Sequence, residues 1–161
     1  MLREAAARDR AAVVELHASP EVHAYLDSPR PRDELERVVP EVPGQRPGYF
    51  VVELDGAAIG TIALSRRDGE RPGHVGTVVE AVELSYLFLP SAWGRGYATE
   101  ACAAALDWLA GIRPGERVVL CTQTANAPSM RLAARLGFTE VMRFEEFGAE
   151  QWFGVRTPPT P

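Results

Sequence analysis

The spacing of apolar and polar residues changes several times along this chain, which predicts an alternation of helices and strands. Apolar residues lie near helical spacing over 3–25, where Pro20 and Pro29 interrupt the pattern, so we expect one or two short helices there. A further short helix is expected over 33–39, because Pro40 cannot continue it.

Runs of β-branched and aromatic residues predict the strands. Residues 49–54 and 58–64 flank the turn dipeptide Asp55-Gly56, which is typical of a hairpin. A loop containing Gly69, Pro72 and Gly73 follows, and the long run at 78–89 predicts a central strand that Pro90 ends. The remaining strands are expected at 117–124, 140–147 and 151–155, the last two forming a hairpin around Gly148.

Two longer helices are expected in the second half of the chain. Residues 98–110 place one apolar stripe on a helix that we expect to end at Gly111. Residues 126–136 predict another helix, with Asn126 as its N-cap and Gly137 just beyond its end. Helices and strands therefore alternate, and the expected fold class is α/β with a mixed sheet.

Length and composition limit the possible functions. A chain of 161 residues fits a single domain over 1–161, in which the proline-rich 157–161 would form a flexible tail. The net charge of −5 argues against a nucleic-acid partner. All 17 basic residues are arginine, which excludes a Schiff-base lysine and the lysine of a phosphate-binding P-loop. No apolar run has membrane length and no signal peptide is evident, so we expect no membrane partner and a cytoplasmic location.

Cysteines and histidines give no sign of a metal site. Cys102 and Cys121 lack the CxxC spacing, and two buried thiols are the expected interpretation. His17, His23 and His74 are scattered without metal-ligand spacing, so no metal is expected.

The most informative segment is the glycine turn between the strand ended by Pro90 and the helix that follows. Gly94 and Gly96 leave the backbone uncrowded, so that successive N–H groups can converge at the positive end of the helix dipole. Such a turn can bind a phosphate or pyrophosphate, and Glu100 is then expected to point away from it. On the glycines alone, a tight turn without a ligand fits equally well.

The run Trp-Gly-Arg-Gly-Tyr-Ala-Thr-Glu-Ala at 93–101 resembles the GNAT superfamily of acetyltransferases, in the branch of ribosomal-protein N-terminal acetyltransferases. Trp93 replaces the polar residue that usually opens the superfamily's glycine pattern. The resemblance implies a mostly antiparallel sheet with a splayed pair of central strands and a loop that holds the pyrophosphate of coenzyme A. The loop residues that inherit this role are Gly94, Arg95, Gly96, Tyr97, Ala98 and Thr99.

A second match is Asn126-Ala-Pro-Ser129, followed by Leu136-Gly137-Phe138. The resemblance implies that Asn126 hydrogen-bonds the pantetheine arm and that Ser129 points toward the thioester sulfur. Helix capping by Asn126 is the structural alternative, and one side chain can do both. Phe88, on the strand that splays, is the expected position for backbone pairing with pantetheine.

Transfer of an acyl group to an amine requires a base and a way to stabilise the leaving thiolate. Glu83 is the candidate base, and strand alternation puts it on one face with Ser85 while Tyr86 and Phe88 share the other. A solvated or ion-paired glutamate is the alternative. Many relatives place a tyrosine seven residues after the asparagine, where this chain has Ala133. Ser129 is left to supply a proton or a hydrogen bond to sulfur, with water as the alternative.

These residues predict acetyl transfer from acetyl-CoA to a primary amine, on a small molecule or a peptide N-terminus, by direct attack in a ternary complex. A non-catalytic acyl-CoA sensor is the alternative function, and a homodimer is compatible with either. The acceptor side is expected near Tyr25, Tyr49 and Trp152. Acidic residues at 34, 36, 80 and 83 would attract a cation, although solvated carboxylates explain them as well.

Overall fold

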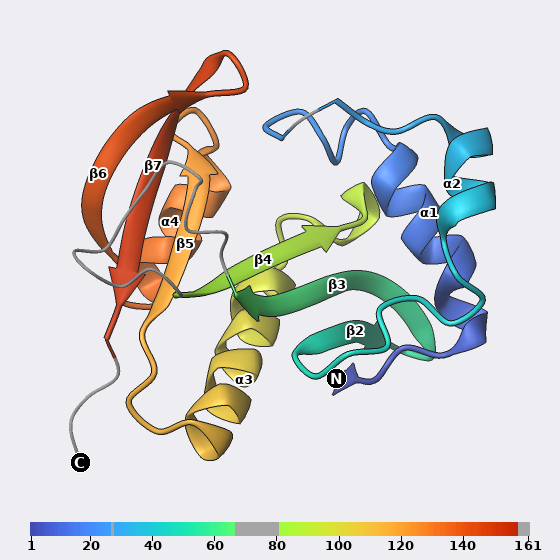
Figure 1. The fold of residues 1–161 in the computed structure, drawn as a ribbon, viewed down its shortest axis with the longest axis horizontal. Coiled ribbons are helices and arrows are strands. Elements are labelled where there is room, and N and C mark those ends of the chain that lie inside the picture. The colour runs from blue at the N-terminus through green and yellow to red at the C-terminus, as the bar shows by residue number, and fades with distance from the viewer. Residues whose placement is uncertain (27, 67–80, 158–161) are drawn as a thin grey trace.

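The computed structural model describes residues 1–26, 28–66 and 81–157. Seven strands form one sheet in the order β1-β2-β3-β4-β5-β7-β6 (Figure 1). All neighbouring strands are antiparallel except β4 and β5, which are parallel. The strands are β1 (Leu2–Arg3), β2 (Tyr49–Leu54), β3 (Ala57–Arg66), β4 (Val82–Phe88), β5 (Val118–Gln123), β6 (Thr139–Glu146) and β7 (Ala149–Arg156).

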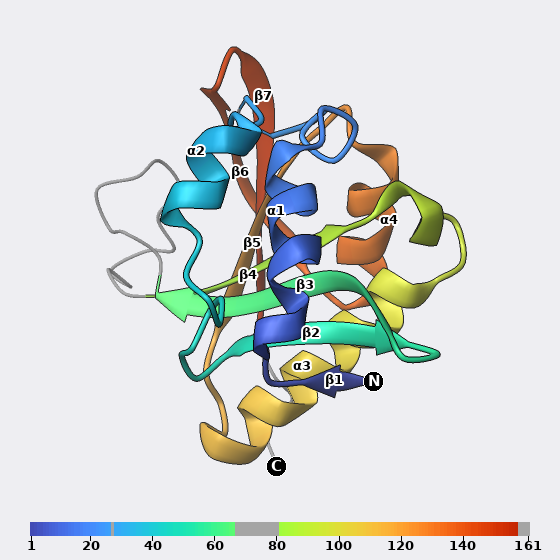
Figure 2. The same cartoon turned by 90° about the vertical axis from the view of Figure 1, so that its right-hand side faces the viewer.

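Helices cover both faces of this sheet. On one face lie α1 (Arg10–Ala18) and α2 (Arg32–Val38), and on the other lie α3 (Tyr97–Ile112) and α4 (Ala127–Arg135) (Figures 1 and 2). The main core lies between the sheet and the second pair of helices. It includes Leu84 and Phe88 of β4, Leu120 of β5 and the fully buried Cys102 and Ala105 of α3.

The turns and helix ends follow local chemistry. Asp55 and Gly56 both have positive φ in the first hairpin, and Phe147 and Gly148 do so in the last. Paired positive φ angles suit the twist of a tight hairpin. The side chain of Asn126 caps α4, as expected, and Gly137 follows that helix with φ of 84°.

Three details differ from the sequence-based expectations. Helix α3 continues through Gly111 to Ile112, because Gly111 keeps a helical backbone and the N–H of Arg113 still bonds to the carbonyl of Leu109. The short strand β1 was not expected, since it depends on pairing with β2 rather than on a local pattern. Strand β4 begins at Val82, whereas the strand was expected to begin at residue 78. Residues 78–80 and the expected loop with Gly69, Pro72 and Gly73 lie outside the described residues.

The two parallel strands at the centre diverge soon after they meet, which confirms the expected splay. In the described residues β4 and β5 pair only at Val82 with Val118 and at Glu83 with Val119. On its other side β4 pairs with β3 along its whole length, from Val82 to Phe88. The far half of β4 therefore has a strand neighbour on one side only, and an opening separates it from β5.

No helix in the described ranges combines the length and the apolar character needed to cross a bilayer.

Candidate functional site

The turn from β4 into α3 leaves room at its surface. After a single 3-10 turn at Pro90–Ala92, Gly94 and Gly96 have φ of 78° and 80°. A Cβ added at either glycine would meet no atom within 4 Å. The glycines are thus required by backbone conformation and not by crowding inside the protein. The space outside them is open to a ligand.

Backbone donors gather at this turn. The N–H of Trp93 donates to the carbonyl of Pro90, and the next backbone N–H that donates is that of Glu100, to the carbonyl of Gly96 at 3.1 Å. Between these two bonds, the six N–H groups of 94–99 donate to no acceptor in the described part of the chain. They lie at the N-terminus of a helix of 16 residues. Unpaired amides at the positive end of a helix dipole are suited to an anion.

The charged side chains at the turn agree with this use. Arg95 is exposed and makes no ion pair with any described residue, so its guanidinium can add to the positive potential. Glu100 is also exposed, as its expected outward orientation requires. The six unpaired N–H groups can donate hydrogen bonds to the oxygens of a diphosphate, and the positive charge of Arg95 is opposite to that of the diphosphate.

Trp93, which departs from the usual motif, has a structural contact that sequence reasoning missed. Its indole Nε1 donates a hydrogen bond of 2.9 Å to the carbonyl of Phe88, the last residue of β4. The N–H of Leu89 donates to Ile59 of β3, so strand alternation directs the N–H of Phe88 toward the opening. The use of Phe88 to pair with a ligand stays a prediction.

Helix α4 contributes polar groups on the far side of the opening. The Oδ1 of Asn126 accepts a hydrogen bond of 3.3 Å from the N–H of Ser129, so the capping role is present. The side-chain amide nitrogen of Asn126, Nδ2, has no partner among the described residues and remains a donor. Ser129 is buried, and its hydroxyl lies 2.6 Å from the hydroxyl of Tyr86 on β4.

The hydroxyl pair of Tyr86 and Ser129 joins β4 to α4 across the opening. Burial raises the pKa of Tyr86 to about 12, and the hydrogen bond with Ser129 offsets part of that rise. The nearby Cys102 thiol also has its pKa raised to about 12 by burial. Both groups are therefore neutral at physiological pH. Sequence alternation put Tyr86 on the correct face, but its contact with Ser129 required the packing of α4 on the sheet.

Glu83 lies where β4 and β5 part, because it forms the last pair between them, with Val119. The side chains of Val82, Leu84 and Phe88 belong to the core beneath α3 and α4, so alternation directs Glu83 to the face of α1 and α2. The two candidate catalytic residues therefore lie on opposite faces of the sheet.

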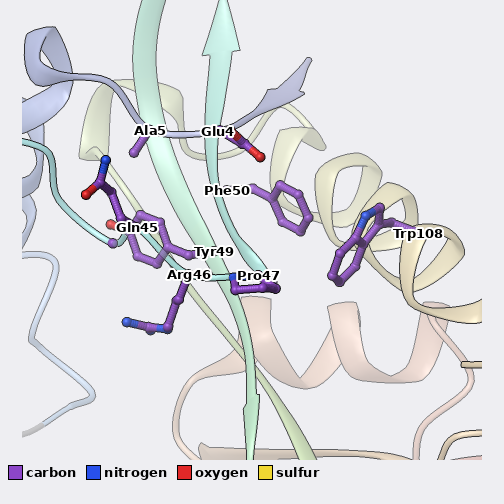
Figure 3. Close-up of a pocket in the computed structure, with 10 residues that line it drawn as sticks. Glu4, Ala5, Gln45, Arg46, Pro47, Tyr49, Phe50 and Trp108 are labelled. Carbon is purple, nitrogen blue, oxygen red and sulfur yellow. The ribbon is translucent and has the colours of Figure 1, made fainter. Parts of the chain in front are cut away.

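A separate hollow of about 400 Å³ lies at the β2 end of the sheet, where the N-terminal segment and the loop before β2 meet α3 (Figure 3). Phe50 and Trp108 line it and contact one another edge to face, with ring centroids 5.0 Å apart. Arg46 lies over the ring of Tyr49. Tyr49 is the only residue expected at the acceptor side that lines this hollow, and none of the expected cofactor residues does.

Other residues expected near the acceptor are placed differently. Trp152 lies in β7 with its side chain buried in the main core, so it is not a loop residue. Glu34 forms an ion pair with Arg30 and Glu36 with Arg10, which neutralises two members of the expected acidic group. Tyr25 is exposed, and residue 80 lies outside the described residues. Of that group, Glu83 is the member that lies at the junction of β4 and β5.

The described residues contain no cluster of three or more histidine, cysteine, aspartate or glutamate side chains arranged to hold a metal ion.

Comparison with known proteins gives the family. The model of the acetyltransferase (GNAT) domain matches residues 1–139. A curated relative, the protein YkkB of Bacillus subtilis (strain 168), is 33% identical over 82 residues. That alignment covers 47% of this chain and 48% of YkkB, so it spans about half the length of the relative.

Solved structures share the fold at low identity. Spermidine N-acetyltransferase from Vibrio cholerae, crystallised with CoA and spermine, matches with a TM-score of 0.76 and 20% identity, covering 98% of this chain and 94% of that one. Ribosomal-protein-alanine N-acetyltransferase from Brucella melitensis matches with a TM-score of 0.71 and 18% identity, covering 98% and 99%. Because the family model matches residues 1–139, well over half of its length, this chain belongs to the GNAT acetyltransferase family.

Proposed function

We propose that this protein transfers an acetyl group from acetyl-CoA to a primary amine by direct attack within a ternary complex. The observation that carries the proposal is the row of six unpaired N–H groups at 94–99, next to the opening between β4 and β5. This arrangement suits a co-substrate that carries a diphosphate and continues into a narrow arm.

Binding is divided between the two sides of the opening. The amides of 94–99 and the guanidinium of Arg95 would hold the diphosphate. The side-chain Nδ2 of Asn126 would donate a hydrogen bond to the pantetheine arm, while its Oδ1 continues to cap α4. The backbone of Phe88 would pair with the same arm, because β4 has no strand neighbour there on the side of β5.

Bound acetyl-CoA supplies an acetyl thioester as the electrophile. Glu83 would take a proton from the acceptor, because an alkylamine with a pKa of about 10 is almost wholly protonated at neutral pH. Ser129 faces the opening from the other side of the sheet and would stabilise the departing sulfur. Direct attack is favoured over an acyl-cysteine route, since Cys102 is fully buried and its pKa is raised to about 12.

The acceptor is proposed to be a cationic amine, on a small molecule or at a peptide N-terminus. The V. cholerae enzyme was crystallised with spermine, and the name of the B. melitensis enzyme gives ribosomal-protein alanine as its acceptor. Glu83 would favour a cation at the face of α1 and α2. A polyamine or a short peptide therefore belongs first in any acceptor screen.

The test is release of CoA on mixing acetyl-CoA with a panel of polyamines, aminoglycosides and peptides. Turnover with at least one amine, and none in its absence, is expected. Calorimetry with CoA is run on the same protein. Tight CoA binding without turnover on any amine would favour the alternative, a non-catalytic acyl-CoA sensor. Absence of CoA binding would exclude both functions.

A further inference from the structure

The hydroxyl pair of Tyr86 and Ser129 is the strongest polar contact at the opening that the proposed function does not fully use. The two oxygens are 2.6 Å apart, and the contact joins the unpaired half of β4 to the first turn of α4. Ser129 is buried, and Tyr86 packs against the main core. A short hydrogen bond between two enclosed hydroxyl groups fixes the orientation of both.

We propose that Tyr86 is a positioning residue that donates its proton to the oxygen of Ser129, so that the Ser129 hydroxyl in turn donates a hydrogen bond to the leaving sulfur. This inference rests on the proposed function. Each hydroxyl has one hydrogen, so when the phenol donates to Ser129, the serine hydrogen is free to point into the opening. The pair then acts as a preorganised donor for the charge that develops on sulfur.

The same pair is unsuited to full proton transfer. The phenol has a pKa of about 12, whereas the thiol of the leaving group has a pKa of about 8.5. Proton transfer from the phenol to the thiolate is therefore unfavourable by a factor of roughly three thousand. A hydrogen bond has no such cost. Ser129 and Tyr86 therefore keep their protons throughout the reaction, and the serine lowers the energy of the thiolate without protonating it.

The atoms balance on this scheme. The amine nitrogen forms a bond to the carbonyl carbon as the carbon–sulfur bond breaks, and the electron pair of that bond leaves with the sulfur. The nitrogen loses two protons: Glu83 takes one from the ammonium before attack and passes it to solvent, and the second leaves the nitrogen by the same route once the new bond has formed. The thiolate departs hydrogen-bonded to Ser129 and takes its proton from water.

The test measures the pKa of the CoA thiol bound to the full chain, from the ultraviolet absorbance of the thiolate during a pH titration. A hydrogen-bond donor to sulfur favours the thiolate over the thiol. We therefore expect the pKa of the bound CoA thiol to be lower in the wild type than in Ser129→Ala or Tyr86→Phe, by about 0.5 to 1. Equal values in all three proteins would overturn the proposal. Desulfo-CoA, which lacks the sulfur, should bind the wild type and both variants equally.

A double-mutant cycle on kcat separates positioning from a general loss of structure. If Tyr86 acts only through Ser129, each single variant loses about 3- to 30-fold in kcat and the double variant loses no more than Ser129→Ala alone. Independent, multiplying losses would overturn the positioning role. The double variant also guards against misfolding, because it leaves no buried hydroxyl without a partner.

Tyr49→Phe is the matched control. Tyr49 is a second tyrosine whose pKa burial raises, and it interacts with Thr61 of β3. Thr61 pairs with Leu87, so strand alternation puts this contact on the opposite face of the sheet from Tyr86. Its loss should leave the pKa of the bound thiol at the wild-type value. If CoA and desulfo-CoA both fail to bind the wild type, the proposed function and this inference fail together. If both bind and acetyl transfer occurs, but the thiol pKa is the same in all variants, only the role of Tyr86 is wrong.

Discussion

The indole nitrogen of Trp93 donates a hydrogen bond of 2.9 Å to the carbonyl oxygen of Phe88, which closes the glycine turn back onto the end of β4. The ring of Trp93 is itself about half exposed. This contact ties the donors at the start of α3 to the strand that borders the opening. It gives a structural reason for tryptophan at the position where related sequences usually carry a polar residue.

Replacement of Trp93 by phenylalanine keeps an aromatic ring and removes this bond. We expect CoA to bind about 3- to 10-fold more weakly, because one hydrogen bond no longer orients the turn. Calorimetry measures the change, and Trp108→Phe, at the distant hollow, is the control. An unchanged dissociation constant for Trp93→Phe would mean that the turn holds its shape without the indole.

Replacement of Gly96 by glutamate places a side chain and a negative charge at the row of unpaired amides. We expect CoA binding to be lost by calorimetry while thermal unfolding stays cooperative. Gly115→Glu is a matched control, since Gly115 also has a positive φ, of 82°, and open space beside it, but follows the other end of α3. Both variants bear the same backbone strain. Equal CoA affinity in the two would refute an anion site at the turn.

Replacement of Glu83 by glutamine removes the proposed base. The fraction of neutral amine rises with pH, so a base is needed most when the acceptor is protonated. We expect the ratio of variant to wild-type turnover to be lowest below about pH 8 and to approach one as the pH nears the pKa of the acceptor. A ratio that stays constant from pH 6.5 to 10 would show that Glu83 is not the base.

A further prediction concerns stability. Asp9 is buried, and its carboxylate accepts hydrogen bonds from two nitrogens of Arg3 and from the N–H of Ala6. Arg3 is the largest cause of a lowered Asp9 pKa. Because the folded pKa is lowered, the ionised carboxylate stabilises the fold above its unfolded pKa of about 3.9. That stabilisation is lost as the pH falls through the folded pKa.

Asp9→Asn should therefore reduce the free energy of unfolding by about 2 kcal/mol at pH 7, measured by urea denaturation. The difference from the wild type should shrink as the pH is lowered from 5 toward 2. Glu34→Gln removes a surface ion pair with Arg30 and should change stability by less than about 0.5 kcal/mol. A difference for Asp9→Asn that does not depend on pH would exclude the ion pair as its cause.

Local chemistry explains which parts of the fold were predictable. The hairpin turns at 55–56 and around Gly148, the cap at Asn126 and the apolar stripe of α3 each depend on residues close in sequence, and all were expected. Phe147 was expected in the strand and lies in the turn. The resemblance to the family added the splay between β4 and β5, which pairing confirms. The C-terminal end of helix α3 was predicted two residues too early, because a glycine in a helix and a glycine after it look alike in sequence.

Long-range packing determines the rest of the site. Tyr86 and Ser129 are 43 residues apart, so no local pattern indicates that their hydroxyl groups meet. The same holds for Glu34 and Glu36, whose charges looked available until their arginine partners were seen. The expected roles of the loop amides, Asn126 and Glu83 stay predictions that the variants above test.

The sparse pairing of β4 with β5 also affects how this molecule can move. Within the described residues, two residue pairs join the block of strands β1–β4 to the block β5–β7, whereas every other junction of strands β2 to β7 has at least six. Among the described residues of strands β2 to β7, this junction has the fewest pairs, so a small rotation of one block against the other breaks the fewest hydrogen bonds there. If the two blocks move relative to one another, we expect the displacement to be concentrated at this junction, where the shared core and the contact of Tyr86 with Ser129 oppose it.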